Sequence, residues 1–314
     1  MMGPTTGRAL VTGAAGFVGT VLTRFLRERG WAVVCTDQGA PERQSDWFAC
    51  SIGDADQVDE MVAWAGPVTH VFHLAALTFA PEASRDPSRA FGTNLQGTVY
   101  LAKAVACHAA AARLVYVSTS EVYGPPQFLP ITEAHPLEPG NPYAISKAAA
   151  DQYCAYLSHT GMDVVRVRPF NHSGPGQTDR FVLSSFARQI ARIEAGKRPA
   201  VLNVGNIETS RDFTHVNDVV RAYEQLAMSG RSGEAYNVCS GRPVLIRDAL
   251  DGLLALSTSK IRIEPDPERL RIVDIQSSWG SYEKLAADTA WRPEVSFQEL
   301  LADLLGYWRK REAP

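Results

Sequence analysis

Residues 12–19 read Thr-Gly-Ala-Ala-Gly-Phe-Val-Gly, and this stretch decides the fold. It follows a short apolar run, Arg8–Thr12, which is typical of a buried strand. It opens a longer stretch, Gly16–Arg29, whose apolar residues recur at the spacing of one helix face. The pattern therefore predicts a strand, a glycine turn and a helix in direct succession.

The three glycines of this turn have different expected roles. Gly13 permits a tight turn, Gly16 lets the backbone approach a pyrophosphate, and Gly19 lets the helix pack closely on the sheet. The free N–H groups at the start of such a helix, here at Phe17 and Val18, attract phosphate oxygens. The turn therefore predicts a dinucleotide site.

Asp37 comes at the end of the next predicted strand, about 20 residues beyond the glycines. A carboxylate at this place accepts hydrogen bonds from the adenosine ribose and repels a 2′-phosphate. Its neighbours Thr36, Gln38 and Gly39 include no lysine or arginine that would hold that phosphate. We therefore expect NAD as the cofactor, with NADP as the less favoured alternative.

Apolar strands alternate with helices through the first half of the chain. The expected strands are Ala32–Thr36, Trp47–Ile52, His70–Ala75, Leu114–Ser118, Asp163–Val167 and Tyr236–Cys239, and the expected helices are Asp56–Ala65, Thr93–Ala111, Pro142–Thr160 and Val219–Met228. This alternation predicts an α/β fold of the Rossmann type, a doubly wound parallel sheet covered on both faces. Turn formers become frequent after Arg168, which predicts a smaller C-terminal lobe. We expect a dinucleotide-binding domain of residues 1–168 plus about 213–240, and a substrate-binding lobe of residues 169–212 plus about 241–314.

Two side chains at helical spacing and one at a strand end predict acid–base chemistry. Tyr143 and Lys147 are four residues apart near the start of a predicted helix, so they share one face. A nearby ammonium group stabilises a phenolate and brings tyrosine closer to working pH. Thr119 follows a predicted strand at the edge where open parallel sheets bind their ligands. Together these residues predict a site in which Tyr143 moves a proton and a nicotinamide moves a hydride.

The composition excludes several other classes of protein. The 314 residues carry a formal net charge of −3, so no basic field exists to attract nucleic acid. The five cysteines show no CxxC spacing, which predicts free thiols and no metal site. No apolar run reaches the ~18 residues of a membrane span, and the first residues lack the apolar core of a signal peptide. We expect a cytoplasmic protein.

The motifs TGAAGFVG, HLAA, STSEVYG and YAISK, in this order, resemble the extended short-chain dehydrogenase/reductases, the NAD-dependent epimerase/dehydratase family. The resemblance covers essentially the whole chain. It implies that Thr119, Tyr143 and Lys147 are catalytic. The cofactor contacts that it implies are Gly13, Gly16, Gly19, Asp37, Ala75, Ala76, Tyr143 and Lys147. Ser51 stands where the family usually has an aspartate that holds the adenine, and Asp54 is the expected substitute.

The second half is similar to bacterial reductases of GDP-4-keto-6-deoxy-mannose, which make GDP-rhamnose. The stretches that carry this likeness are RPFNHSGPGQ, VGNIETSRDFTHVNDVVRAY and GEAYNVCSG. The resemblance implies that Asn171 and Arg211 contact the diphosphate of a sugar nucleotide, and Arg271 is a further phosphate candidate. Two departures are Asp37, where some of these reductases are more basic, and Ile272, where proline is usual.

Ser120 and Glu121 leave the reaction open. Related dehydratases and decarboxylases also carry Ser-Glu here, and a dehydratase uses the glutamate to remove a proton from C5. In a reductase the carboxylate of Glu121 and the hydroxyl of Ser120 would bind the sugar, which is the interpretation we favour. The alternatives are therefore a reductase and a redox-neutral epimerase, dehydratase or decarboxylase with tightly held NAD. A dinucleotide sensor is disfavoured because Thr119, Tyr143 and Lys147 are all present.

Two of the predicted helices, Thr93–Ala111 and Pro142–Thr160, also predict a homodimer through a four-helix contact. Both are rich in small or apolar residues, and the family resemblance points to the same helices. The positions expected at the contact are Ala104, Ala106, Ala109, Ala110, Ala149, Ala150, Cys154 and Leu157.

Overall fold

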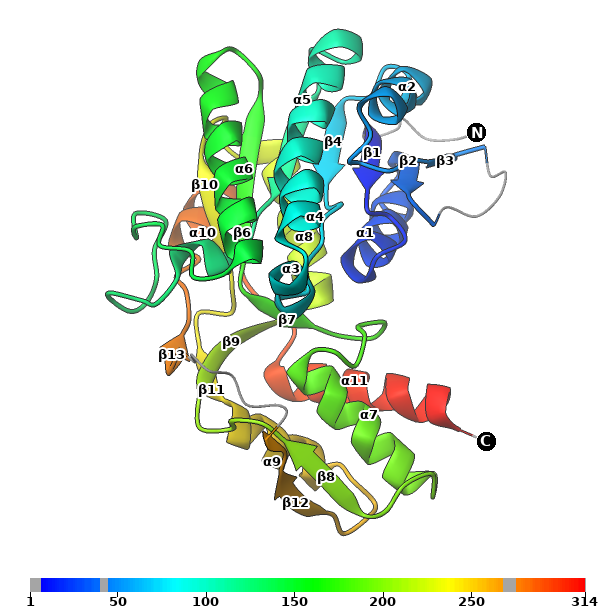
Figure 1. Ribbon diagram of the computed structural model, residues 1–314, viewed down its shortest axis with the longest axis vertical. Helices are drawn as coiled ribbons and strands as arrows, with labels where there is room; N and C mark the ends of the chain where they lie inside the picture. Colours follow the sequence, from blue (N-terminus) through cyan, green and yellow to red (C-terminus); the bar gives the residue numbers. More distant parts are fainter. Residues whose placement is uncertain (1–6, 40–44, 268–274, 314) are drawn as a thin grey trace.

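The computed structural model describes residues 7–39, 45–267 and 275–313, which form two parts stacked along the long axis (Figure 1). The larger part is built on a seven-stranded sheet with the order β10-β6-β5-β4-β1-β2-β3. All six neighbouring pairs in this sheet run parallel. The strands are β1 (Arg8–Thr12), β2 (Ala32–Asp37), β3 (Trp47–Ala49), β4 (His70–His73), β5 (Arg113–Val117), β6 (Val164–Pro169) and β10 (Ala235–Val238). The predicted α/β fold with a parallel Rossmann-type sheet is confirmed.

Helices cover both faces of this sheet, and each face has its own core. Apolar side chains of α1 (Phe17–Glu28), α8 (Val216–Ser229) and α10 (Glu283–Thr289) pack on one face. Those of α2 (Ala55–Ala65), α5 (Gly97–His108) and α6 (Pro142–His159) pack on the other. Because both faces are buried, the strands are apolar almost without interruption, as the sequence led us to expect.

The strand order reverses beside β1, since β2 lies on one side of it and β4 on the other. In open parallel sheets this reversal leaves a crevice at the carboxyl ends of the strands, where ligands bind. The residues that follow β1, β2, β4 and β5 therefore meet at one edge of the sheet. This edge faces the smaller part of the molecule (Figure 1).

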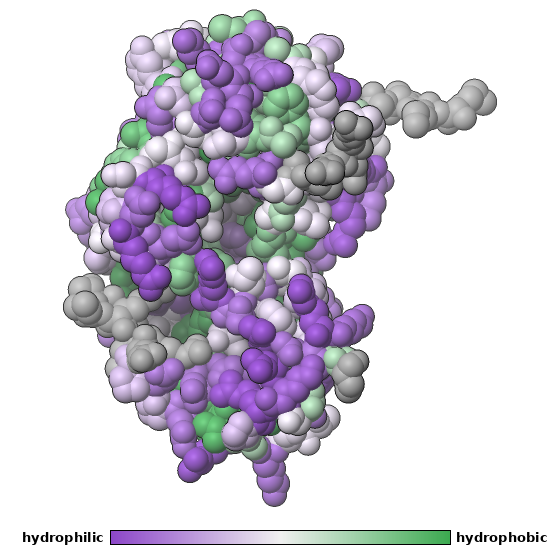
Figure 2. All heavy atoms as spheres, turned by 45° about the vertical axis from the view of Figure 1, so that its right-hand side comes forward, coloured by the Kyte–Doolittle hydropathy of each residue, from purple (hydrophilic) through white to green (hydrophobic). Residues whose placement is uncertain are grey.

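The smaller part combines two short sheets with three helices. Strand β9 (Ser210–His215) lies between β11 (Pro243–Leu245) and β13 (Ser277–Ser278) and also pairs with β7 (Asn171–Ser173). Strands β8 (Val201–Val204) and β12 (Arg262–Pro265) form a separate pair. Helices α7 (Val182–Glu194), α9 (Ile246–Ala255) and α11 (Phe297–Glu312) pack around one apolar core. Figure 2 shows the surface pinching in between the two parts.

Several elements differ from the sequence prediction. Strand β3 ends at Ala49 rather than Ile52. The helix predicted from Thr93 begins with a π-helical turn, Gly92–Gln96, before α5. Residues 283–289 were assigned to the second lobe, but they form helix α10, which packs against α8 and β10 of the larger part. The division into a dinucleotide-binding domain and a substrate-binding lobe stays a prediction.

The positions predicted for a dimer contact need correction. Five of them lie in the core between α5, α6 and the sheet, where their side chains pack within the subunit and cannot reach a second copy. These are Ala104, Ala109, Ala150, Cys154 and Leu157, all at most 9% exposed. In the described residues, no helix is long and apolar enough to cross a membrane.

Candidate active site

The glycine turn is as compact as the sequence requires. Gly13 has a φ of +70°, and a Cβ atom there would lie 2.8 Å from the backbone nitrogen of Ala75. A Cβ atom at Gly19 would clash with the carbonyl oxygen of Gly13. Helix α1 begins at Phe17, with Gly16 as its N-cap, so its first N–H groups face the crevice without a side-chain cap. Such a turn fits the pyrophosphate of a dinucleotide, because it brings unpaired donors close to the ligand.

Asp37 lies beside this turn, at the end of β2. Its Oδ2 accepts a hydrogen bond from the backbone nitrogen of Ala15 at 3.2 Å, and its Oδ1 lies 3.5 Å from the nitrogen of Gly39. Gln38, the next residue, donates to the hydroxyl of Ser51 at 3.1 Å. The carboxylate of Asp37 is half-buried, and it lies where the ribose of a dinucleotide bound at the glycine turn would be expected. This position fits the predicted ribose contact, which stays a prediction.

Asp54 has another use in the structure. It is the N-cap of α2, and its Oδ1 accepts hydrogen bonds from the backbone nitrogens of Asp56 and Gln57. Its Oδ2 accepts a further bond from the side chain of Gln57 at 2.8 Å. Helix capping therefore accounts for the carboxylate of Asp54, and its substitution for the family's adenine contact at Ser51 stays a prediction.

A buried histidine ties the end of β4 to the glycine turn. His73 hydrogen bonds through Nδ1 to Thr12 at 2.8 Å and through Nε2 to Thr98 at 3.0 Å. Burial lowers the pKa of His73 to about 3, so the ring is neutral and serves as a structural link. The hydroxyl of Thr12 also accepts a bond from the backbone nitrogen of Ala75. These bonds place Ala75, and Ala76 after it, against the turn.

Tyr143 and Lys147 lie in the first two turns of α6, and both are buried. Asn141 caps the helix by accepting a hydrogen bond from the backbone nitrogen of Ala144 at 2.9 Å. Thr119 follows β5, and its hydroxyl is near enough to Tyr143 to oppose the rise in the pKa of the phenol. The structure thus brings together Thr119, Tyr143 and Lys147, the three residues that were predicted as catalytic.

The environment shifts the pKa values of the two titratable groups in opposite directions. Burial raises the pKa of Tyr143 above its usual range, the charge of Glu121 adds to this, and the Thr119 hydrogen bond opposes it. Burial lowers the pKa of Lys147 to about 8. The Lys147 ammonium donates to the carbonyl oxygen of Val117 at 2.6 Å and lies 4.4 Å from the ring centre of Tyr116. The phenol of Tyr143 is therefore a proton donor at neutral pH.

Ser120 and Glu121 begin a short 3-10 helix, Ser120–Tyr123, directly after Thr119. Ser120 is half-buried and Glu121 is exposed. The amide nitrogen of Asn141 donates to Oε2 of Glu121 at 3.0 Å. This bond joins Glu121 to the N-cap residue of the helix that carries Tyr143.

The predicted substrate residues lie on the smaller part. Asn171 is exposed on β7, which pairs with β9, the strand that holds Arg211. One guanidinium nitrogen of Arg211 donates to the carbonyl oxygens of Ser210 and Ile275, at 2.9 and 2.7 Å. The structure therefore places Asn171 and Arg211 on one small sheet, while Arg271 lies outside the described residues.

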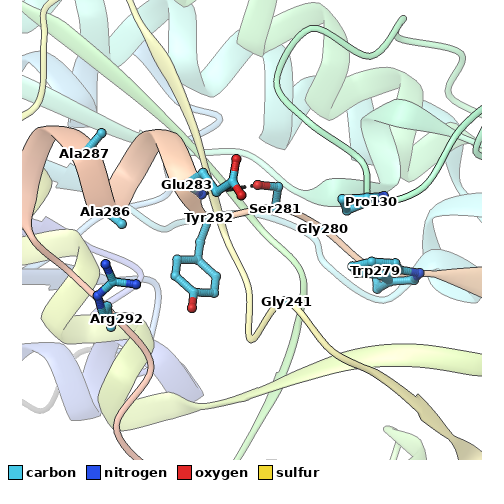
Figure 3. Close-up of a pocket in the computed structure, with 10 residues that line it drawn as sticks. All are labelled: Pro130, Gly241, Trp279, Gly280, Ser281, Tyr282, Glu283, Ala286, Ala287 and Arg292. Atoms are coloured by element: carbon cyan, nitrogen blue, oxygen red, sulfur yellow. Dashed lines mark hydrogen bonds between the residues drawn. The ribbon is translucent and has the colours of Figure 1, made fainter.

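Two hollows lie near the crevice. One, of about 360 Å³, lies between the glycine turn and the second lobe, and its walls include Gly16, Phe17, Pro175, Gly176 and Tyr307. The other, of about 540 Å³, opens where α10 begins, and its lining includes none of the predicted site residues. Figure 3 shows Tyr282 at its centre, with Trp279 and Arg292 on either side of the ring. Because Gly16 and Phe17 line the first hollow, this part of the predicted cofactor site lies at the junction of the two parts.

Comparison with known proteins agrees with this geometry. Residues 10–304 match the family model described as GDP-mannose 4,6 dehydratase. The chain belongs to this family of extended short-chain dehydrogenase/reductases. It is similar to GDP-6-deoxy-D-mannose reductase of Pseudomonas aeruginosa, with 39% identity over 98% of both chains. It is also 29% identical to a UDP-glucose 4-epimerase of Mycolicibacterium smegmatis, over 97% of this chain and 99% of the relative.

Two solved structures of the extended family have the same fold. The structure of RMD from Pseudomonas aeruginosa complexed with NADPH matches with a TM-score of 0.88 at 37% identity, over 98% of this chain and all of that one. A UDP-glucose 4-epimerase from Thermus thermophilus in complex with NAD matches with a TM-score of 0.85 at 29% identity, over 96% and 99%. The predicted membership of the extended family, and with it an NAD(P)-dependent enzyme of nucleotide sugars, is confirmed.

Asn94, which shapes this dehydrogenase site, was not predicted from the sequence. Asn94 lies in the π-helical turn before α5 and is 1% exposed. Its amide group bonds both backbone groups of Leu77, the residue after Ala76, and donates to the hydroxyl of Ser146 at 2.9 Å. It therefore fixes the loop after β4 against α6, between Tyr143 and Lys147. Its signal in the sequence is weak, because Asn94 stands among other polar residues such as Thr93 and Gln96, and propensity alone does not separate it from a surface residue.

A second missed feature lies one helical turn beyond Lys147. Asp151 is completely buried, and both of its oxygens accept hydrogen bonds from Arg168 on β6, at 2.8 and 3.0 Å. Arg166 adds a third bond at 2.8 Å. Arg168 also donates to the hydroxyl of Tyr123, which donates to Asn237 on β10. The sequence signal was two arginines in an apolar strand, which require a buried partner.

We expect Asp151→Asn to lower the free energy of unfolding by about 3–5 kcal/mol, because it leaves the buried Arg168 without its counter-charge. Chemical denaturation followed by circular dichroism measures this loss. The matched control is Glu28→Gln, which removes a carboxylate from an ion pair whose side chains are both 67% exposed, and should change stability by less than about 0.5 kcal/mol. Equal losses in the two variants would contradict a special role for the buried pair.

Proposed function

We propose that this protein is a cytoplasmic reductase of a nucleotide-linked 4-keto-6-deoxy sugar, converting GDP-4-keto-6-deoxy-mannose to GDP-rhamnose with NAD(P)H. The observation that carries the proposal is the buried phenol of Tyr143, held protonated beside the hydroxyl of Thr119. The likeness to GDP-6-deoxy-D-mannose reductase over nearly the whole of both chains supports the substrate. In this proposal residues 1–168 and about 213–240 hold the dinucleotide, and the remaining residues hold the sugar nucleotide.

The residues of the site have distinct roles in such a reduction. A reduced dinucleotide, with its pyrophosphate held by the glycine turn, would supply the hydride. Thr119 and Tyr143 hold the carbonyl oxygen at C4, and Tyr143 gives it the proton. Lys147 then stabilises the phenolate that remains, because an ammonium group one helical turn away favours the charged form. Burial of all three residues excludes water from the reacting oxygen.

The diphosphate of the sugar nucleotide would lie against the second lobe. Asn171 and Arg211 share one small sheet there, and a guanidinium group suits a phosphate geometrically. Arg271 remains a further candidate. Ser120 and Glu121, between Thr119 and the second lobe, would bind hydroxyl groups of the sugar.

A redox-neutral reaction is the second candidate, and the carboxylate of Glu121 at the site supports it. A dehydratase would use this carboxylate to remove a proton from C5 of the sugar. An epimerase or dehydratase also keeps its NAD through the cycle, so the purified protein would carry the absorbance of bound dinucleotide. Conversion of a nucleotide-linked 4-hydroxy sugar without added reduced cofactor would establish this candidate and exclude the reductase.

We expect Tyr143→Phe to lower turnover of the 4-keto sugar by on the order of 10²–10⁴-fold, since it removes only the proton-bearing oxygen. Dinucleotide affinity should stay within a few-fold of the parent. Product formation is followed by mass spectrometry and affinity by calorimetry. Tyr156→Phe is the control, because Tyr156 lies on the same helix but is 60% exposed. Near-parental turnover of the Tyr143 variant would exclude Tyr143 as the proton donor.

We further propose that NADH is preferred over NADPH. The support is Asp37, whose carboxylate lies beside the glycine turn where a 2′-phosphate would meet it. The similar RMD structure is complexed with NADPH, so this preference would distinguish the two proteins. The double change Asp37→Ser with Gln38→Arg should shift kcat/KM toward NADPH. Equal or better kinetics of the parent enzyme with NADPH would show that Asp37 does not select the cofactor.

We also propose a homodimer through the outer faces of α5 and α6. On α6, Ile145, Ala149, Tyr153 and Tyr156 lie along one side, and Ile145 and Tyr156 are 41% and 60% exposed. Two copies of this face can form a self-complementary contact. Tyr156→Glu should convert the dimer to a monomer in analytical ultracentrifugation. Met228→Glu, on an exposed position of α8, should not. A monomeric parent protein at micromolar concentration would contradict the proposal.

A further inference from the structure

The segment after β4 covers the proposed proton donor. It runs from Leu77 into helix α3 (Ala80–Arg85). Leu77 and Ala83 form one apolar cluster with the ring of Tyr143, and Ala80 packs against this cluster. Tyr143 is 7% exposed, so the carbonyl group of a sugar has little room to approach the phenol while the segment stays in place.

This segment is held weakly on its own part of the molecule. Ala83 is the buried residue of α3, and Ala90 is that of the next helix, α4 (Pro87–Phe91). Alanine side chains bury little apolar surface, so they contribute little to the packing on α6. A helix of six residues is also not stable alone in water. Residues 78–85, which we call the flap, can therefore detach at a small cost in free energy.

Both ends of the flap are fixed. On one side, the side chain of Asn94 bonds the backbone nitrogen and oxygen of Leu77, at 2.8 and 3.1 Å. On the other side, the carboxylate of Asp86 caps α4 by accepting a hydrogen bond from the backbone nitrogen of Arg89 at 3.0 Å. These two anchors confine any movement to the flap between them.

Two residues of the smaller part hold the flap from across the crevice. The guanidinium group of Arg180 lies 5.3 Å from the ring centre of Phe79 and 3.3 Å from Oε2 of Glu82. The ring of Phe181 meets that of Phe79 edge-on, with the ring centres 6.3 Å apart. Figure 1 shows α3 at the edge of the larger part that faces the smaller part. These four side chains, which we call the clasp, therefore join the two parts beside the site.

The clasp is exposed to solvent, and each of its contacts is modest. The side chains of Arg180 and Glu82 are 60% and 36% exposed, and Phe181 is 39% exposed. An exposed ion pair, a cation–π contact and an aromatic pair are each worth up to about tenfold in an equilibrium constant. Together they favour the closed flap and still let it open during turnover.

We propose that the flap opens to admit the sugar nucleotide to Tyr143, and that Arg180 and Phe181 hold it closed over the bound substrate. The identity of the substrate rests on the proposed function, whereas the clasp belongs to the protein alone. Closure excludes water from the phenol and joins the segment that covers it to the part that is proposed to hold the diphosphate.

The test is hydrogen exchange of the Arg180→Gln variant, measured by mass spectrometry without ligands. The change removes both the ion pair to Glu82 and the contact with Phe79, so the flap should open more often. The amides of Glu82 and Asp86, which bond carbonyl oxygens within the flap, should then exchange roughly tenfold faster. The amides of β1 and α5 should keep their parental rates, because neither element carries a residue of the clasp.

The matched control is Arg89→Gln, which removes the other partner of the same carboxylate. Arg89 pairs with Glu82 at 2.9 Å from within the larger part, and its loss leaves Arg180 in place. Exchange in the flap should therefore stay within about twofold of the parent. Equal rises in the two variants, no rise in Arg180→Gln, or a rise spread over the whole chain would each overturn the proposal.

Ligand binding gives a second readout. NADPH together with GDP-mannose, a nucleotide sugar without a keto group to reduce, should slow exchange of the flap in the parent protein several-fold, because a bound sugar favours the closed state. Calorimetry shows whether the two ligands bind. Binding without slower exchange would overturn the proposal, since the flap would then not close over the ligand.

The two readouts separate this inference from the proposed function. If Arg180→Gln speeds exchange in the flap alone but the protein neither binds nor reduces a GDP-linked sugar, the proposed function fails while the flap and its clasp stand. If the parent reduces the 4-keto sugar but flap exchange is the same in Arg180→Gln and in the parent, the function stands and the inference fails.

Discussion

The buried ion pair between Asp151 and Arg168 is the interaction on which the catalytic half of this structure depends. Both side chains are almost completely excluded from solvent, so neither charge is tolerated without the other. Burial alone would raise the pKa of Asp151, but the hydrogen bonds and charges of Arg168 and Arg166 together outweigh it and hold that pKa below its usual value. Because the pair joins α6 to β6, it sets where α6 lies along the sheet edge, and with it the positions of Tyr143 and Lys147.

From this pair, a chain of polar contacts extends to the segments that line the crevice. Tyr123, at the end of the short helix that starts with Ser120, receives a bond from Arg168 and donates one to Asn237. Asn237 donates to the carbonyl oxygen of Ile131 and, through its backbone, to Glu133. Each of these residues has at least one partner, and buried networks that are paired in this way are rigid. The loop before α6 and the segment after Thr119 are thus fixed by the same contacts that fix the helix.

Features that depend on local sequence patterns could be predicted from the sequence, whereas features that depend on contacts between distant residues could not. Strand β1 and the start of α1 follow from the glycine turn, because a tight turn, a packed helix and a phosphate site all need glycine at set places. The pair Tyr143 and Lys147 follows from helical spacing. Asn94, Asp151 and Arg168 could not be found in this way, since their partners are up to 52 residues away and no local pattern shows which groups they bond. The capping of α2 by Asp54 is also a local feature, but the adenine contact expected of this carboxylate stays a prediction.

The same carboxylate that fixes α6 also influences the charge of the site. Burial disfavours the ammonium form of Lys147, and Asp151, four residues further along the helix, is one of the groups that oppose this effect. Without it, a lysine with a pKa already lowered to about 8 would lose more of its charge near neutral pH. Asp151 cannot neutralise Lys147 directly, because its oxygens are committed to Arg166 and Arg168. Lys147 therefore keeps a positive charge that pairs with no carboxylate of the described residues, which is the state required to hold an anionic dinucleotide and to stabilise a phenolate after proton transfer.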